Sequence, residues 1–359
     1  MRSATYFFIF MKRRLKRLGY FLLVIFILIN AVCIWQAFTV SHFSQGTTAK
    51  KSHSDLLEQK FNRIFGQKHP RQALVDSLTI PHQSLYITAD SLKLAAWYLK
   101  HGADSAVKGT VIMFHGYGGC RSEIIPEATA FYTMQYNVLM IDFRAHGNSE
   151  GNICSLGYFE SDDVRESYNY IKRTGEKNII LWGGSMGAAS IIKAMHDDSD
   201  IQPSKVILEK SYGDMTDAVE GYISKTLHEP GEPLATMLTF WGCVEEGAWM
   251  FEMKPEVYAK KISCPALIQW GSLDETVSKQ ETENIYNNLG SSQKKLVIYP
   301  GCHHESLLLK DTFLWKTSVS SFLDSSAVPQ GPINKKKHHN SSKATAAPSV
   351  SSIPGNQSS

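Results

Sequence analysis

One serine of this chain stands in a setting that can make its hydroxyl a nucleophile. The segment Gly183–Gly184–Ser185–Met186–Gly187 follows the apolar run Asn178–Trp182 and precedes the helical run Ala188–Met195. In a tight turn from strand to helix, glycine two residues before and after the serine avoids collision with neighbouring backbone. The turn would raise the Ser185 hydroxyl and leave the Met186 amide at a helix N-terminus, where it can stabilise an oxyanion. The pattern predicts acyl transfer at Ser185, with a plain tight turn as the alternative interpretation.

A serine hydroxyl needs a base, and the base needs a carboxylate that orients it. Asp274 follows the apolar run Ala266–Trp270, and His304 follows the apolar run Leu296–Tyr299. Both residues therefore fall in loops after predicted strands, at the edge of a parallel sheet where Ser185 is also expected. This agreement predicts a triad of Ser185, Asp274 and His304.

Other residues could fill two of these roles. Asp274 could instead cap the helix that follows it, with Glu209 or Asp214 as the substitute acid. His303 could be the base in place of its neighbour His304. The sequence favours Asp274 and His304 and leaves these alternatives open.

A second oxyanion donor is expected in the loop after the strand Thr110–His115. This loop continues as Gly116–Tyr117–Gly118–Gly119, and its glycines allow an amide to turn inward. We predict that the Tyr117 N–H donates to the oxyanion, with the Gly118 N–H as the alternative. The polar segment Asp142–Gly151 is predicted to brace neighbouring loops by hydrogen bonds rather than to take part in the chemistry.

The elements that must position these residues can be read from short apolar runs bounded by turns. They predict eight strands, at Ser84–Thr88, Leu92–Leu99, Thr110–His115, Asn137–Asp142, Asn178–Trp182, Lys205–Glu209, Ala266–Gly271 and Lys295–Tyr299. Helical patterns follow most of them, at Ser122–Gln135, Glu160–Arg173, Met186–Met195, Lys279–Leu289 and Ser306–Leu323. The first two strands suit a hairpin, and the rest predict a mostly parallel sheet covered by helices on both faces.

The N-terminal region is predicted to anchor the protein in a membrane. Residues 18–40 carry no charge and would rise about 35 Å as a helix, enough to cross a bilayer. The basic cluster within residues 1–17 should stay in the cytoplasm, which places the rest of a single-pass protein on the non-cytoplasmic side. A cleaved signal peptide and a buried core helix are the alternatives.

The remaining chain divides by composition. Residues 41–75 are polar and are predicted to form a stalk with a short helix, and residues 76–324 to form the catalytic domain. Within it, residues about 212–261 break the strand–helix rhythm and predict a small helical cap rich in aromatic residues and methionine. Residues 325–359 have almost no aliphatic content and are predicted to be a disordered tail.

Charge and cysteine spacing exclude some functions. The formal net charge is +3, and its excess lies at the two ends of the chain, so no nucleic-acid partner is expected. None of the six cysteines forms a C-x-x-C pair, which gives no support to zinc or dithiol chemistry.

The motifs together resemble the α/β-hydrolase superfamily over roughly residues 85–323. The segments that carry the resemblance are His115–Gly119, Asp142–Gly151, Gly183–Gly187, Asp274–Val277 and Gly301–Glu305, in which His303 stands where the family usually has glycine. The nearest branch is similar to esterases, monoglyceride lipases and serine aminopeptidases. The resemblance implies an α/β-hydrolase fold with a backbone oxyanion hole.

The expected activity is hydrolysis of a small-molecule carboxylic ester through an acyl-enzyme, with no cofactor and no metal. A peptidase or acyltransferase on the same triad is the alternative, and a non-catalytic binding module is a third. An aminopeptidase would need an acidic pocket, for which the cap offers Glu229, Glu232, Glu245, Glu246 and Glu252.

Overall fold

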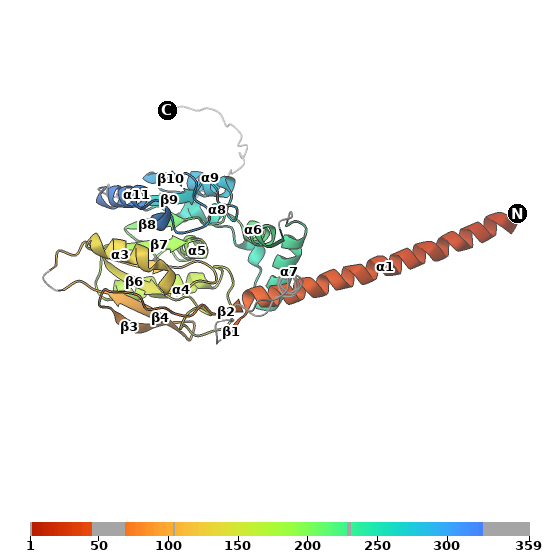
Figure 1. Ribbon diagram of the computed structural model, residues 1–359, viewed down its shortest axis with the longest axis horizontal. Helices are drawn as coiled ribbons and strands as arrows, with labels where there is room; N and C mark the ends of the chain where they lie inside the picture. Colours follow the sequence, from red (N-terminus) through yellow and green to blue (C-terminus); the bar gives the residue numbers. More distant parts are fainter. Residues whose placement is uncertain (1, 45–68, 103–104, 228–230, 326–359) are drawn as a thin grey trace, which may run out of the picture. The chain divides into compact units, whose positions relative to one another are not determined.

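An eight-stranded mixed sheet forms the centre of the protein (Figure 1). The computed structural model describes residues 2–44, 69–102, 105–227 and 231–325. The strand order is β10-β9-β8-β7-β5-β6-β4-β3, and neighbours from β10 to β6 are parallel, whereas β4 is antiparallel to both β6 and β3. The strands are β3 (Gln83–Ala89), β4 (Leu92–Leu99), β5 (Thr110–Phe114), β6 (Asn137–Ile141), β7 (Ile179–Gly184), β8 (Lys205–Glu209), β9 (Ala266–Gly271) and β10 (Lys294–Tyr299). This arrangement confirms the predicted α/β-hydrolase fold.

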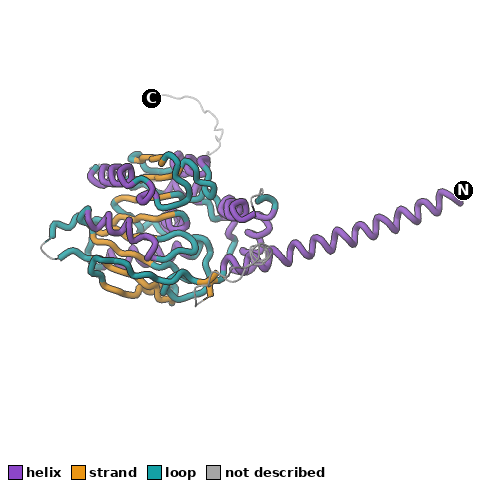
Figure 2. Tube along the Cα trace, in the orientation of Figure 1, coloured by secondary structure: helices purple, strands orange, loops and turns teal. Residues whose placement is uncertain are grey.

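Successive side chains of each strand point to opposite faces of the sheet, so apolar side chains pack against a helical layer on each face. Ile112 and Phe114 of β5 belong to one buried cluster, and Val111 and Met113 belong to the other. The first cluster is completed by α4 (Glu160–Arg173), α5 (Met186–Asp197) and α9 (Lys279–Asn288), and the second by α3 (Ile125–Thr133), α10 (Leu307–Lys310) and α11 (Thr312–Asp324). Figure 2 shows the strands as a stack with helices beside it. Burial on both faces explains why most strands read as continuous apolar runs.

Two predicted helices are each divided in the structure. The helix expected at Ser122–Gln135 begins as a 3₁₀ turn, η1 (Arg121–Ile124), and α3 then starts with Pro126 in its first turn. The helix expected at Ser306–Leu323 is α10 followed by α11, and the Asp311 side chain accepts a hydrogen bond from the Leu314 amide as the cap of α11. A proline in the first turn marks the start of α3, and a side-chain cap marks the start of α11.

Helices fill the segment between β8 and β9, where the strand rhythm breaks. They are α6 (Met215–Leu227), α7 (Leu234–Glu246), η2 (Met250–Glu252), α8 (Pro255–Tyr258) and η3 (Ala259–Lys261). A third buried cluster, which includes Met215, Cys243 and Met253, packs α6 and α7 together and reaches Trp270 of β9. This small helical cap therefore has an apolar core of its own.

The apolar N-terminal segment belongs to a long helix, α1 (Arg2–Ser41). Within the described residues, it is the one helix that is long and apolar enough to cross a membrane. The helix begins well before residue 18, because the basic residues that precede the apolar run are good helix formers.

Both described ends of the region predicted as a stalk lie against the catalytic domain. Strand β1 (Phe43–Ser44) pairs with β2 (His69–Pro70), and Phe43 is buried in the core. Arg71 donates hydrogen bonds to the carbonyl oxygens of Ser149 and Gly151. The short helix predicted between these ends, and the predicted tail, lie outside the described residues.

Candidate active site

The backbone at Ser185 is strained in the way that a nucleophile elbow requires. Ser185 links β7 to α5 with φ 54° and ψ −116°, a conformation that residues other than glycine rarely adopt. A Cβ at Gly183 would lie 2.5 Å from the Gly187 carbonyl carbon, and a Cβ at Gly187 would lie 2.3 Å from the Phe114 carbonyl oxygen. Both positions therefore exclude any larger residue, as the spacing of the motif predicted.

Three side chains from distant parts of the sequence meet at this elbow. His304 Nε2 lies 2.9 Å from Ser185 Oγ, and His304 Nδ1 lies 2.7 Å from Asp274 Oδ2. Asp274 follows β9 and His304 follows β10, so parallel strands bring both loops to the same edge of the sheet. The arrangement can pass a proton from Ser185 to an imidazole that a carboxylate orients.

Asp274 is fixed by donors on both of its oxygens. Oδ1 accepts from the amides of Thr276 at 2.8 Å and Val277 at 3.0 Å, and Oδ2 faces His304. Burial acts to raise the pKa of Asp274, but the hydrogen bonds from His304 and from the two amides outweigh it and hold the pKa below its usual value. Asp274 is therefore held as a carboxylate beside His304.

The two alternative acids are held by other partners, and the alternative base is exposed. The Glu209 carboxylate accepts from the indoles of Trp182 and Trp315, and burial raises its pKa to about 7. Asp214 forms an ion pair with Lys254 at 2.9 Å. His303 is exposed, whereas its neighbour lies within hydrogen-bonding distance of Ser185.

The loop after β5 approaches the elbow closely. A Cβ at Gly116 would lie 3.5 Å from Ser185 Cβ. The Gly118 amide donates to His146 Nε2 at 3.1 Å, so this alternative oxyanion donor is already engaged. The Met186 amide is at the first turn of α5, where backbone N–H groups have no partner within the helix.

Two buried imidazoles brace this loop in their neutral form. His146 Nδ1 lies 2.8 Å from the Arg144 carbonyl oxygen, which leaves Nε2 to accept from Gly118. The His115 ring likewise bridges the Gly116 carbonyl oxygen and the Phe143 amide. Burial lowers the pKa of His115 to about 4 and, together with the nearby His115, lowers the pKa of His146. Neither ring is placed to replace His304 as the base.

The segment after β6 supplies the rest of this bracing network. Asp142 accepts from the Arg121 amide at 2.7 Å and from the Asn148 amide at 2.9 Å, and it pairs with the Arg121 guanidinium. Arg144 is paired with buried Asp163 at 2.6 Å. Buried hydrogen-bond networks of this kind make loops rigid.

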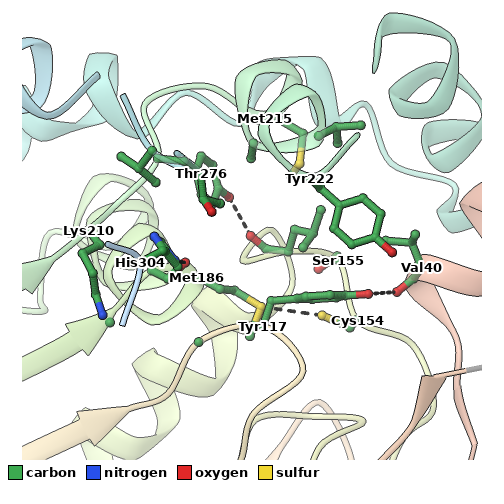
Figure 3. A pocket seen from close by; sticks show the side chains of 18 of the residues that line it. Val40, Tyr117, Cys154, Ser155, Met186, Lys210, Met215, Tyr222, Thr276 and His304 are labelled. Atoms are coloured by element: carbon green, nitrogen blue, oxygen red, sulfur yellow. Dashed lines mark hydrogen bonds between the residues drawn. The ribbon is translucent and has the colours of Figure 1, made fainter. Parts of the chain in front are cut away.

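A cavity of about 1150 Å³ opens beside Ser185 and His304 (Figure 3). Its walls include Met215, Val219 and Tyr222 of α6, and Leu238 and Glu246 of α7. Such a volume accommodates a small-molecule ligand, and the walls are mainly apolar.

The end of α1 forms another wall of this cavity, which the sequence did not predict. Ala37, Val40 and Ser41 line it, and the Tyr117 hydroxyl donates to the Val40 carbonyl oxygen at 2.7 Å. Figure 3 shows the Tyr117 hydroxyl directed at the Val40 carbonyl oxygen. The predicted anchor is thus joined to the loop that carries the predicted oxyanion donor.

One of the acidic residues proposed for a peptidase pocket, Glu246, lines the cavity. Burial raises the pKa of Glu246 to about 7. Glu245 lies 3.5 Å from His42, Glu232 and Glu252 are exposed, and Glu229 lies outside the described residues.

The fold and this site define the protein as an α/β-hydrolase. Residues 105–223 and 239–311, more than half of the chain, match the family described as "Serine aminopeptidase, S33", and the chain belongs to this family.

Relatives and solved structures agree with this assignment. The chain is 24% identical over 257 residues to the uncharacterized protein YfhR of Escherichia coli O157:H7, covering 69% of this chain and 82% of YfhR. It is 24% identical over 240 residues to the uncharacterized membrane protein YNL320W of Saccharomyces cerevisiae, covering 66% of this chain and 78% of that protein. The esterase Pf2001 of Pyrococcus furiosus has the same fold, with a TM-score of 0.58 and 22% identity, covering 70% of this chain and 96% of the esterase.

Proposed function

We propose that this protein is a membrane-anchored serine hydrolase that cleaves carboxylic esters, with Ser185, His304 and Asp274 as its triad. The observation that carries the proposal is the continuous chain of contacts from Asp274 through His304 to Ser185, at 2.7 and 2.9 Å. It supports proton transfer along the geometry that nucleophilic serine catalysis needs. The strained backbone of Ser185 supports the same role, because strain of this kind collects at functional sites.

In the proposed reaction, Ser185 Oγ bonds to the acyl carbon while its proton passes to His304 Nε2. The ester C–O bond then breaks, and the same proton goes to the leaving alkoxide. A water molecule then repeats these two steps. Its proton passes to His304 while its oxygen bonds to the acyl carbon, and Ser185 recovers that proton from His304 as the carboxylic acid leaves. The Met186 and Tyr117 amides are the proposed donors to the oxyanion.

An ester substrate is favoured by the cavity walls. Met215, Val219 and Leu238 offer apolar contact to an acyl chain, and methionine adapts to chains of different shape. Glu246 is the observation that favours the second candidate, an aminopeptidase, because a carboxylate in the cavity can pair with a free amino group. Since burial holds the Glu246 pKa near 7, this charge is incomplete at neutral pH.

We also propose that α1 crosses a membrane and that its basic residues face the cytoplasm. Lys12, Arg13, Arg14, Lys16 and Arg17 precede the apolar stretch, and positive charge is retained on the cytoplasmic side. The catalytic domain would then lie on the non-cytoplasmic side. The name of the yeast relative YNL320W, a membrane protein, supports association with a membrane.

A substrate panel on the full chain tests the activity. Purified protein in detergent should hydrolyse p-nitrophenyl butyrate faster than an aminoacyl p-nitroanilide, and Ser185→Ala should abolish both activities. Faster cleavage of the anilide, with loss in Glu246→Gln, would establish the aminopeptidase instead. Hydrolysis of neither substrate by the wild-type protein would refute the proposal.

A further inference from the structure

The cap carries an exposed aromatic surface next to the anchor helix. Phe240 and Val244 of α7 and the nearby Trp249 are 43%, 57% and 55% exposed. Partly buried Trp241 contacts the ring of Phe240, and partly buried Phe251 contacts the ring of Trp249; these five residues are called the aromatic patch below. An apolar patch of this kind is unusual on a surface that meets only water.

The cap contacts α1 far inside the apolar stretch. Trp241 Nε1 donates to Asn30 Oδ1 at 3.0 Å, and Asn30 Nδ2 donates to the Phe26 carbonyl oxygen at 2.8 Å. The amide of Asn30 thus has partners for its oxygen and for its nitrogen. Such pairing is what a polar side chain needs where water is excluded.

The rise of α1 fixes the level of this contact relative to a bilayer. From Leu18 to Asn30 the helix rises about 18 Å, whereas the hydrocarbon core is about 30 Å thick. If the hydrocarbon begins at Leu18, directly after the basic cluster, it ends near Ala37. Asn30 then lies about 10 Å inside the hydrocarbon. A tilted helix spans less depth, so tilt would carry Asn30 deeper.

The same measure places the wall of the active-site cavity that α1 forms at the membrane surface. Ala37 and Val40, which line the cavity, lie on α1 where the hydrocarbon meets the headgroups. A lipid ester in the leaflet holds its carbonyl group at this level and its acyl chain below it. The mainly apolar walls beyond Ser185 suit such a chain.

We infer that the aromatic patch enters the outer leaflet of the membrane that α1 crosses, and that the cavity takes an acyl ester of a membrane lipid directly from that leaflet. This inference rests on the proposed anchor and triad, and it adds the source and class of the substrate. Interfacial aromatic surfaces of this kind bury about 5–10 Å into the leaflet, which agrees with the depth of Trp241 beside Asn30.

Lipid quenching tests the insertion without reference to activity. Full-length protein is reconstituted in phosphatidylcholine vesicles that carry a nitroxide on the acyl chain, and tryptophan emission is compared between wild type and Trp249→Phe. The emission that Trp249 contributes should fall by roughly half or more, as expected for a side chain in the leaflet. Emission from Trp249 that the lipid nitroxide leaves unchanged would overturn the inference, and a dimer of the full chain in those vesicles would then identify the patch as a contact between two copies.

Paired substrates test where the ester comes from. The double variant Phe240→Ser, Trp249→Ser should keep hydrolysis of soluble p-nitrophenyl butyrate, because neither residue lines the cavity beside Ser185. Its hydrolysis of a long-chain monoacylglycerol in vesicles should fall roughly tenfold. The matched control is Phe313→Ser, which removes an aromatic ring that is 81% exposed on α11 and should change neither rate.

The outcomes separate this inference from the proposed function. Absence of soluble-ester hydrolysis by the wild-type protein would refute the proposed triad, whereas extraction of the protein by alkaline carbonate would refute the proposed anchor. Equal hydrolysis of the vesicle substrate by the wild type and the double variant would overturn only the inference that the leaflet supplies the ester.

Discussion

Replacement of Asp274 by asparagine should invert the hydrogen bonding of His304. The amides of Thr276 and Val277 both donate to Asp274 Oδ1. An asparagine at this position would keep its carbonyl oxygen toward those amides and turn its NH₂ group toward His304 Nδ1. Since an NH₂ group only donates, His304 Nδ1 would have to accept, and the ring proton would move to Nε2. His304 Nε2 could then no longer accept the proton of Ser185.

The expected loss of activity is large because the substitution removes the function of His304 as a base without disturbing the fold. We expect kcat for p-nitrophenyl butyrate to fall by about 10³- to 10⁴-fold, which corresponds to about 4–5.5 kcal/mol of transition-state stabilisation. Steady-state kinetics on the full chain measure it, with thermal unfolding as the check on folding.

The matched control for this variant is Asp214→Asn. Asp214 is paired with Lys254 rather than with His304, so its kcat should stay within about threefold of the wild-type value. A loss below about tenfold in Asp274→Asn, or an equal loss in both variants, would refute the role given to Asp274.

Three further perturbations test the elbow, the link to α1 and the buried imidazoles. Gly187→Ala places a Cβ 2.3 Å from a backbone oxygen at the end of β5, so the free energy of unfolding measured in urea should fall by at least about 3 kcal/mol. In the control Gly102→Ala, the new Cβ meets no atom within 4 Å, and the free energy of unfolding should fall by less than about 1 kcal/mol. Tyr117→Phe removes a hydrogen bond to the end of α1 and should lower the free energy of unfolding by about 1–2 kcal/mol; no change in thermal unfolding would contradict that link. The pKa of His146 is lowered in the folded protein. As the pH falls below about 6.5, His146 therefore becomes protonated in the unfolded wild type but stays neutral in the folded wild type. The stability advantage of the wild type over His146→Asn should therefore shrink by about 1.4 kcal/mol per pH unit below that point, and a constant difference would contradict it.

The local sequence predicts most of the fold because the strands are buried on both faces. Lys205–Glu209 and Ala266–Gly271 are predicted with the same ends that β8 and β9 have, since each is a short run closed by turn residues. The helix Glu160–Arg173 is likewise predicted with the bounds of α4, which starts with acidic residues and ends with basic ones.

The site could be predicted as far as strand ends and motif order determine it. Parallel strands must bring the loops after β7, β9 and β10 to one edge, which is why Ser185, Asp274 and His304 could be named from the sequence. The choice between His303 and His304 depends on the path of one loop, which only the folded structure determines. The predicted roles themselves are tested by the variants above.

The contact between α1 and the catalytic domain could not be predicted. Val40 and Tyr117 are far apart in sequence, and an apolar helix gives no local sign of the surface against which it packs. Asn30 was an available signal, because an amide within an apolar helix needs a partner.

Covalent labelling of the nucleophile tests the central claim most directly. A fluorophosphonate probe reacts with a serine whose proton a neighbouring base removes, and mass spectrometry of the digested protein locates the adduct. We predict a single adduct on the peptide that contains Ser185, at a rate that falls strongly in His304→Ala. Labelling at another residue, or labelling of Ser185 at an unchanged rate in that variant, would contradict the account.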